Sequence, residues 1–259
     1  MILQNPSSLG YIPKRIVSLV PSQTELLYTL GLETETIGIT KFCTHPPHWL
    51  KTKQITGGTK NLKANKIRDL LPDLIIANKE ENVKGQIELL AADYPVWVSD
   101  VNNLEDALKM IDDIGILTGK SSSAKELCSQ IKNAFSSLPV INRPLRTAYL
   151  IWQNPYMTVG GDTYINDMLR HCGLENVFSN KIRYPEVTVN DIASAGCDLV
   201  ILSSEPYPFK QKHLTELTRQ LPDTKIILAN GEFFSWYGSR LLLAPDYFKS
   251  LSTSCFSKL

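Results

Sequence analysis

The sequence predicts an α/β protein with two similar lobes, each built on a parallel β-sheet, joined by a long backbone helix and enclosing a ligand cleft between the lobes. Three observations predict this class. Short β-branched apolar runs alternate with helical patterns, the same order of elements occurs twice, and an uninterrupted helical stretch separates the halves. We expect an N-terminal lobe at 1–101, a helical linker at 102–142 and a C-terminal lobe at 143–259.

The first half alternates strand and helix. Ser22 and Glu25 have the spacing of a capping box that begins a helix, and Gly31 is expected to end it. Pro72 stops a second helix before an apolar strand. The expected elements are a strand at 15–20, a helix at 22–30, a strand at 36–40, a helix at 62–71 and strands at 74–77 and 96–98.

The second half repeats this order. The run Asp198–Leu202 resembles Asp73–Ala77 at an offset of 125 residues, and the same offset carries Glu80 onto Glu205. The expected elements are strands at 147–151, 198–202 and 225–228 and a helix at 162–171.

Two apolar stripes at helical spacing occupy the linker. One runs from Leu104 to Ile114 and the other from Ala124 to Phe135, with Gly119 between the two helices. A helical connection is stiff, so we expect limited hinge motion and a ligand site in the cleft.

Composition excludes several classes of protein. The 27 Lys and Arg against 26 Asp and Glu give a net charge of +1, which is unsuited to nucleic-acid binding. The apolar runs are too short to span a membrane.

The N-terminus lacks the basic and apolar regions of a signal peptide. The five cysteines include no C-x-x-C pair. We therefore expect a cytoplasmic protein, although a periplasmic or lipid-anchored protein without its leader would have the same sequence.

Candidate ligand-binding residues follow the predicted strands, because ligands of parallel sheets bind beyond the carboxyl ends of the strands. Aromatic side chains in these loops suit a large flat or apolar ligand, and the alternative is that they pack the interface between the lobes. The candidates are His45, Asn78, Glu80, Glu81, Trp152, Tyr156, Glu205, Tyr207, Glu232, Phe233, Trp236, Tyr237 and Arg240.

Metal coordination is the second hypothesis for this edge. Cys43, His45 and His48 are closely spaced, and His45 with Glu205 and Glu232 could supply metal ligands. The alternative is that His45 lines a pocket while His48 faces solvent.

Catalytic motifs are mostly absent from the sequence, which contains no G-x-S-x-G, H-E-x-x-H, G-x-G-x-x-G or G-x-x-x-x-G-K-[ST] pattern. Cys43 and His45 lack a third, orienting group for nucleophilic catalysis. Gly160 and Gly161, before Asp162, could offer backbone N–H groups to an anion, or form a turn and an N-cap.

The segments Arg15–Glu25, Pro72–Ala77 and Tyr184–Thr188 resemble those of class III periplasmic binding proteins. The vitamin B12-binding proteins of ABC importers are the most similar, followed by siderophore and haem binders. The resemblance runs from about Arg15 to Leu251. It implies a ligand held between the lobes, no catalysis and docking to a membrane permease.

The resemblance also assigns positions. Ligand-contacting residues of the B12 binders correspond to His45, Asn78, Tyr184, Glu232 and Trp236, and only Tyr184 and Glu232 keep the chemical type. Two further positions concern docking to the membrane permease. The glutamates that meet an ABC permease correspond to Lys84 and Asn190, with Glu81 and Asp191 close by in sequence.

These observations predict a monomeric, non-catalytic binding protein for a corrinoid such as cobalamin, a tetrapyrrole such as haem, or a ferric or other metal chelate. No tightly bound cofactor is expected. One alternative is an importer subunit whose leader has been removed. Another is a cytosolic metal-dependent enzyme with Glu205 or Glu232 as general base.

Overall fold

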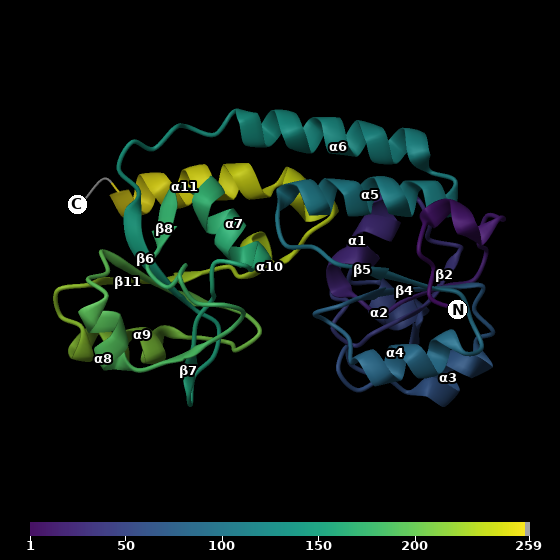
Figure 1. Cartoon of the computed structure of the whole chain (residues 1–259), viewed down its shortest axis with the longest axis horizontal. Helices are drawn as coiled ribbons and strands as arrows, with labels where there is room; N and C mark the ends of the chain where they lie inside the picture. Colours follow the sequence, from purple (N-terminus) through teal and green to yellow (C-terminus); the bar gives the residue numbers. More distant parts are fainter. Residues whose placement is uncertain (257–259) are drawn as a thin grey trace. The chain divides into compact units, whose positions relative to one another are not determined.

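The computed structural model describes residues 1–256, with side chains up to residue 253, so the thiol of Cys255 lies outside the described residues. The chain forms two compact units (Figure 1). Unit 1 comprises Met1–Val101, Glu105–Lys132 and Tyr237–Leu242, and unit 2 comprises Asn102–Leu104, Asn133–Trp236 and the chain from Leu243 on. The residues of the expected 102–142 linker are thus shared between the two units.

Unit 1 contains a five-stranded parallel sheet of order β3-β2-β1-β4-β5. Its strands are β1 (Ile16–Ser18), β2 (Thr36–Ile39), β3 (Gln54–Ile55), β4 (Leu74–Asn78) and β5 (Val96–Ser99). Its helices include α1 (Pro21–Thr29), α2 (Trp49–Thr52), α3 (Ala64–Asp69) and α4 (Lys84–Ala91), and the 3-10 helices η1 (Pro6–Leu9) and η2 (Ser239–Leu242) also belong to it. The β-branched and leucine residues of the strands fill its core, as the sequence predicts.

Two details of unit 1 differ from the sequence prediction. The capping box is wrong, because α1 begins at Pro21 after Val20, which makes no side-chain cap bond. Proline suits this first helical position because the N–H it lacks has no partner inside the helix. The short β3 and α2 were not predicted, since neither spans enough residues to show a periodic pattern.

Two helices turn back on each other at Gly119, as the two apolar stripes indicate. They are α5 (Leu104–Thr118) and α6 (Ser121–Ser136), and Gly119 has a φ of +71°. A side chain at Gly115 would lie 2.4 Å from the Cβ of Ala124, so glycine permits the close approach of the helices. The Cys128 thiol lies 3.4 Å from the carbonyl oxygen of Leu108.

Unit 2 contains a four-stranded parallel sheet of order β11-β10-β6-β8 and a two-stranded antiparallel ribbon, β7-β9. The strands are β6 (Leu145–Leu150), β7 (Tyr156–Met157), β8 (Leu174–Asn176), β9 (Glu186–Val187), β10 (Leu199–Ser203) and β11 (Lys225–Ala229). The helices are α7 (Tyr164–His171), α8 (Val189–Ser194), α9 (Gln211–Gln220), α10 (Glu232–Ser235) and α11 (Ala244–Phe256). Two parallel sheets, one in each half of the chain, confirm the predicted fold class.

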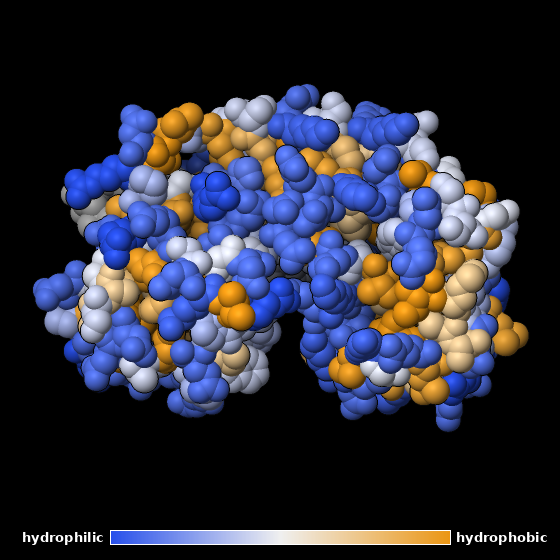
Figure 2. Space-filling model, viewed as in Figure 1, coloured by the Kyte–Doolittle hydropathy of each residue, from blue (hydrophilic) through white to orange (hydrophobic). Residues whose placement is uncertain are grey.

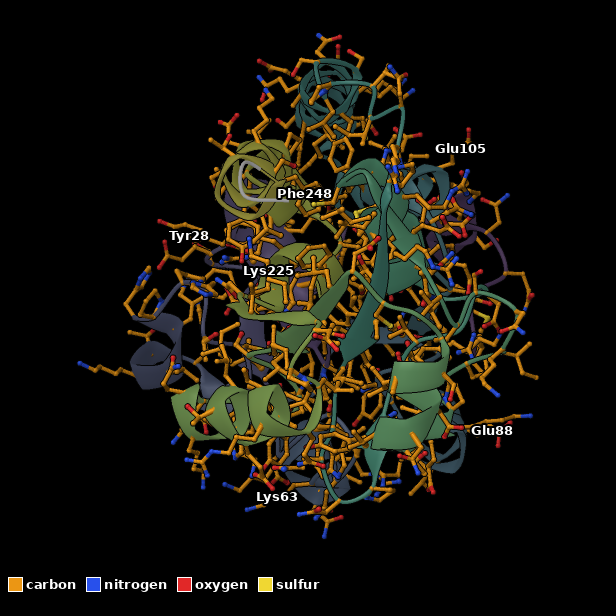
Figure 3. The ribbon with its side chains drawn as sticks, turned by 90° about the vertical axis from the view of Figure 1, so that its left-hand side faces the viewer. Tyr28, Lys63, Glu88, Glu105, Lys225 and Phe248 are labelled. Atoms are coloured by element: carbon orange, nitrogen blue, oxygen red, sulfur yellow. The ribbon has the colours of Figure 1, made fainter. Side chains whose placement is uncertain are left out.

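Aromatic packing joins α10 and α11 to the sheet of unit 2. Phe234 is fully buried, with its ring centroid 5.2 Å from Tyr149 and 5.0 Å from Phe248. Figure 3 shows Phe248 at α11 and Lys225 at β11. This packing fixes α10, whose first residue is Glu232.

The surface in the space-filling view is mostly hydrophilic, with smaller apolar areas (Figure 2). Exposed apolar side chains include Tyr11, Ile12 and Leu71. Among residues 1–256, no helix combines the length and the apolar character needed to cross a membrane.

Candidate functional site

The loop after β2 carries the first candidates of unit 1. Cys43 is fully buried, and its Sγ lies 3.1 Å from Thr24 Oγ1 and 3.2 Å from Thr40 Oγ1. Burial raises the pKa of this thiol, which the two threonine hydroxyls oppose. A buried thiol that resists ionisation is a poor nucleophile, so Cys43 anchors the loop.

The two histidines of this loop have different surroundings. His48 is exposed, and its Nε2 lies 3.2 Å from Glu33 Oε1. Hydrogen bonds from His48 and Trp49 lower the pKa of Glu33. His45 is half-buried. The exposure of His48 agrees with the sequence analysis, while the role of His45 stays a prediction.

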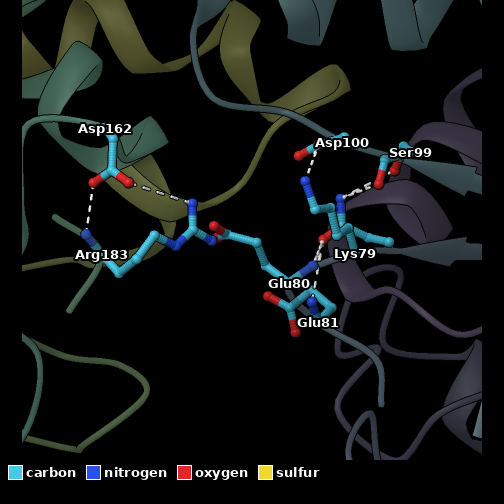
Figure 4. A network of polar contacts seen from close by, with 8 residues as sticks. Lys79, Glu80, Glu81, Ser99, Asp100, Asp162 and Arg183 are labelled. Atoms are coloured by element: carbon cyan, nitrogen blue, oxygen red, sulfur yellow. Dashed lines mark hydrogen bonds and ion pairs between the residues drawn. The ribbon is translucent and has the colours of Figure 1, made fainter. Parts of the chain in front are cut away.

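The loop after β4 is shaped by Asn78, which is 1% exposed. Its Oδ1 accepts the backbone N–H groups of Glu80 (2.9 Å) and Glu81 (3.1 Å), and its Nδ2 donates to Ser99 (Figure 4). Lys79 Nζ lies 2.6 Å from the Asp100 carboxylate. We therefore assign Asn78 to the support of this loop, because its side chain is enclosed by the protein.

Glu81 is a half-buried carboxylate at this edge. Burial raises its pKa, and the positive charge of Lys60 opposes the rise. The Lys60 ammonium donates to the carbonyl oxygen of Glu80. A carboxylate with a perturbed pKa in a loop at the ligand edge of a sheet is typical of a functional group.

Glu81→Gln tests this environment. Because the folded-state pKa is raised, Glu81 contributes stability that is fully present below its ordinary value of 4.5 and is lost as the pH rises through the folded-state pKa. Glutamine does not titrate, so we expect the variant to be more stable than wild type at pH 7, by about 1 kcal/mol, with no gain at pH 4. Melting temperatures from pH 4 to 8 measure this. The exposed Glu88→Gln is the control, and equal pH profiles for the two variants would contradict the prediction.

An aromatic cluster lies in unit 2 at the ends of β6 and β10. The ring centroids of Trp152 and Tyr207 are 5.6 Å apart, and Trp152 is 41% exposed. Tyr207 Oη donates to Gln153 Oε1 at 3.0 Å, and Gln153 Nε2 contacts Tyr156 Oη at 3.4 Å. The structure thus brings together three of the predicted ligand-binding aromatics, Trp152, Tyr156 and Tyr207.

The loops after β10 and β11 contact each other around Gly231. The Ser235 hydroxyl donates to Glu205 Oε1, and Gly231 N donates to Ser204 Oγ at 2.9 Å. A side chain at Gly231 would lie 2.3 Å from Ser203 Oγ. Glu232, three residues beyond the end of β11, is half-buried. Phe233, the remaining aromatic candidate here, stacks on Tyr247 with 4.3 Å between centroids.

Tyr184 lies beside a glycine turn. The Arg183 guanidinium lies 5.8 Å from its ring centroid, and Arg183 also pairs with Asp162 (Figure 4). Gly160 N donates to Arg183 O at 2.7 Å and Gly161 N donates to Lys181 O at 2.9 Å. These N–H groups are engaged within the protein, so the anion hypothesis for them is wrong. The N-cap of α7 is Thr163, not Asp162.

The last three candidates are enclosed by the protein. Trp236, Tyr237 and Arg240 are 7%, 6% and 8% exposed. Arg240 forms a two-point ion pair with Glu25 of α1, with Nε–Oε2 at 2.9 Å and Nη2–Oε1 at 2.7 Å. Arg240 therefore fastens the 237–242 segment to α1, a role that the sequence did not reveal because the two residues are far apart in the chain.

No group of three His, Cys, Asp or Glu side chains within residues 1–253 could hold a metal ion. The structure therefore lends no support to a metal site made by His45, Glu205 and Glu232, which stays a prediction. The positions predicted to replace docking glutamates, Lys84 and Asn190, are both exposed. Asp191 accepts from Thr188 in a capping box that lowers the pKa of its carboxyl.

An open pocket of about 540 Å³ lies elsewhere in unit 2, between α7 and the connection from α6 to β6. Its lining includes Phe135, Ile141 and Arg170. Because this connection precedes β6, the pocket is at the amino edge of the sheet. It is thus separate from the candidate ligand loops.

Phe42 is an exposed aromatic residue that is not among the candidates predicted from the sequence. It is 50% exposed in the loop after β2, next to the buried Cys43. A polar-rich loop with an aromatic residue directly after a predicted strand was the available signal. The burial of Cys43, which sends its neighbour outward, was not readable from the sequence.

The carboxyl edges of the two sheets thus present loops rich in aromatic and acidic side chains, as in ligand-binding α/β proteins. A vitamin B12-binding protein of Photorhabdus laumondii is 24% identical over 244 residues, covering 92% of this chain and 88% of that protein. An uncharacterised ABC transporter substrate-binding lipoprotein of Bacillus subtilis, YvrC, is 26% identical over 201 residues, covering 73% and 63%.

The fold is also similar to that of solved structures. The apo form of the periplasmic heme-binding protein RhuT from Roseiflexus has a TM-score of 0.81 at 18% identity, covering 94% of this chain and 98% of that one. A model of the periplasmic binding protein family matches residues 16–222.

The expected cytoplasmic location is wrong. The Bacillus subtilis relative is named as a lipoprotein and the structurally similar RhuT as a periplasmic protein, which points to a location outside the cytoplasm. The cysteine argument fails for a physical reason: Cys43, Cys172 and Cys197 are each buried, and burial protects a thiol in any compartment. By its sequence match and its two parallel-sheet units, the chain belongs to the periplasmic binding protein family.

Proposed function

We propose that this protein is a non-catalytic binding protein that captures a corrinoid, another tetrapyrrole or a ferric chelate and delivers it to an ABC permease. The observation that carries the proposal is the aromatic cluster of Trp152, Tyr156 and Tyr207 beside the Glu205 loop, at the carboxyl edge of the unit 2 sheet.

A large flat ligand suits this cluster. Trp152 leaves two fifths of its surface exposed, while its contact with Tyr207 and the hydrogen bonds of Gln153 hold the cluster in place. Rigid aromatic side chains provide contact area at a low cost in conformational entropy. Glu205 and Glu232 would then orient polar groups at the edge of the ligand.

The chemistry of the loops supports binding without turnover. Cys43, the cysteine of the loop after β2, is buried with a raised pKa, and the Glu205 carboxylate accepts a hydrogen bond from Ser235. The relatives support the same class, since the Bacillus subtilis protein is named as an ABC transporter substrate-binding lipoprotein.

Ligand-dependent stabilisation tests the proposal. We expect one of hydroxocobalamin, haemin or a ferric hydroxamate to raise the melting temperature in proportion to the logarithm of its concentration, because binding to the folded state alone adds stability. The ligands are coloured, so an absorption titration measures the same affinity. Trp152→Ala should weaken binding by about tenfold, and the exposed Leu71→Ala, on unit 1, is the control. If none of the three ligands changes either signal, the proposal fails.

A further inference from the structure

We infer that Phe42 and Lys41 form a ligand contact on unit 1, a stacking platform that selects a flat ring carrying carboxylate groups. This inference rests on the proposed function and deepens it by naming the ligand class. Neither residue is among the candidates predicted from the sequence. Both follow β2 directly, at the carboxyl edge of the unit 1 sheet.

The backbone beneath the platform is fixed. Lys41 N donates to Gly57 O at 2.8 Å, and Phe42 N contacts Thr40 Oγ1 at 3.4 Å. On the other side of Phe42, the side chain of Cys43 is buried against Thr24 and Thr40. The inward side chain of Cys43 therefore turns its neighbour Phe42 out of the core.

A glycine turn lies close to the ring. A Cβ at Gly58 would lie 3.1 Å from Phe42 Cε2 and 3.5 Å from Lys41 Cε. The turn is closed by the hydrogen bond from Gly58 N to Asn61 O at 3.0 Å, and Gly57 has a φ of +115°. The absence of a side chain at Gly58 lets the ring lie close to the turn, and Phe42 stays 50% exposed.

Lys41 supplies the charge of the platform. Its Nζ lies 4.9 Å from the Phe42 ring centroid, within the range of a cation–π contact. In the part of the chain with described side chains, no acidic group lies within ion-pair distance of Lys41. The ammonium is therefore available to a ligand.

A ring ligand with acidic substituents matches both features. The exposed aromatic surface favours stacking of a flat conjugated ring, and the neighbouring ammonium favours a carboxylate at its edge. A ring with only neutral substituents would use the first feature alone. Haemin, with two carboxylates, and its dimethyl ester differ in this second feature and are therefore the probes.

The experiment is an absorption titration of both probes with wild type, Phe42→Ala, Phe42→Leu and Lys41→Gln. We expect Phe42→Ala to weaken both probes about tenfold, with Phe42→Leu only partly restoring affinity. Lys41→Gln should weaken haemin about three- to fivefold and leave the ester unchanged. The haemin effect should shrink in high salt. Lys125→Gln, on the exposed side of α6, is the charge control.

The outcomes separate this inference from the proposed function. If wild type binds none of the coloured ligands, the proposed function itself fails. If wild type binds haemin but the Phe42 and Lys41 variants match Lys125→Gln, the platform is refuted while the function stands. Binding of cobalamin without haemin, or equal losses for haemin and ester in Lys41→Gln, refutes the carboxylate selection. Because both side chains are exposed, unchanged melting temperatures confirm that the variants fold.

Discussion

Arg240→Ala is expected to destabilise the protein by about 3–5 kcal/mol, the usual cost of removing one partner of a buried ion pair. The side chains of Arg240 and Glu25 are 9% and 17% exposed, and two short contacts join them. Without the guanidinium, Glu25 would keep an uncompensated charge in a largely dehydrated place. For a protein of this size the melting temperature should fall by about 6–20 °C.

A matched control is available in the same unit. Arg68 pairs with Asp93 at 3.1 Å, but the two side chains are 36% and 50% exposed, so Arg68→Ala should cost at most about 1 kcal/mol. The double variant Arg240→Ala with Glu25→Gln should recover part of the loss, because no lone charge remains. Equal melting temperatures for Arg240→Ala and Arg68→Ala would show that the buried pair does not hold the 237–242 segment.

Gly161→Ala is expected to cost about 1–3 kcal/mol, the range for forced overpacking. Its Cβ would lie 2.2 Å from the carbonyl oxygen of Ser179, a backbone atom that cannot rotate away. Moving the two segments apart would also strain the hydrogen bond from Gly161 N to Lys181 O. Denaturant unfolding of the variant measures the loss.

The control for this substitution is a glycine-to-alanine change that should raise the stability of the protein. Gly85 lies in α4, and a Cβ added there would meet no atom within 4 Å, so Gly85→Ala should stabilise the protein by about 0.5–1 kcal/mol through helix propensity. If Gly161→Ala is as stable as wild type, the turn can shift to accept the added Cβ without loss of stability. The hydrogen bonds donated by the N–H groups of Gly160 and Gly161 would then not contribute to the stability of the fold.

The elements with strong local patterns were predictable. The β-branched runs at 74–78 and 199–203 are buried strands, and the stripes of α5 and α6 follow the 3.6-residue period that places apolar residues on one face. The ribbon β7-β9 was not predictable, because two-residue strands pair only through contacts about 30 residues apart in sequence.

The sequence predicted which loops carry the candidate residues better than it predicted which side chains of those loops are exposed. The rule that ligands bind at the carboxyl ends of parallel strands selected the loops after the strands as candidates, and Trp152, Tyr156 and Tyr207 do form a cluster there. The rule does not tell which loop residues point inward. Asn78 and Arg240 are enclosed by their own hydrogen-bond partners, while Phe42 is exposed.

The sequence alone thus determined the fold class, the repeat of two α/β halves and the loops in which a ligand is expected, because hydrophobic period and strand order are local properties of the chain. Only the tertiary structure decided the role of individual side chains. Glu25 and Arg240 are 215 residues apart, and the burial of a charge or an aromatic ring depends on neighbours that folding brings from distant segments.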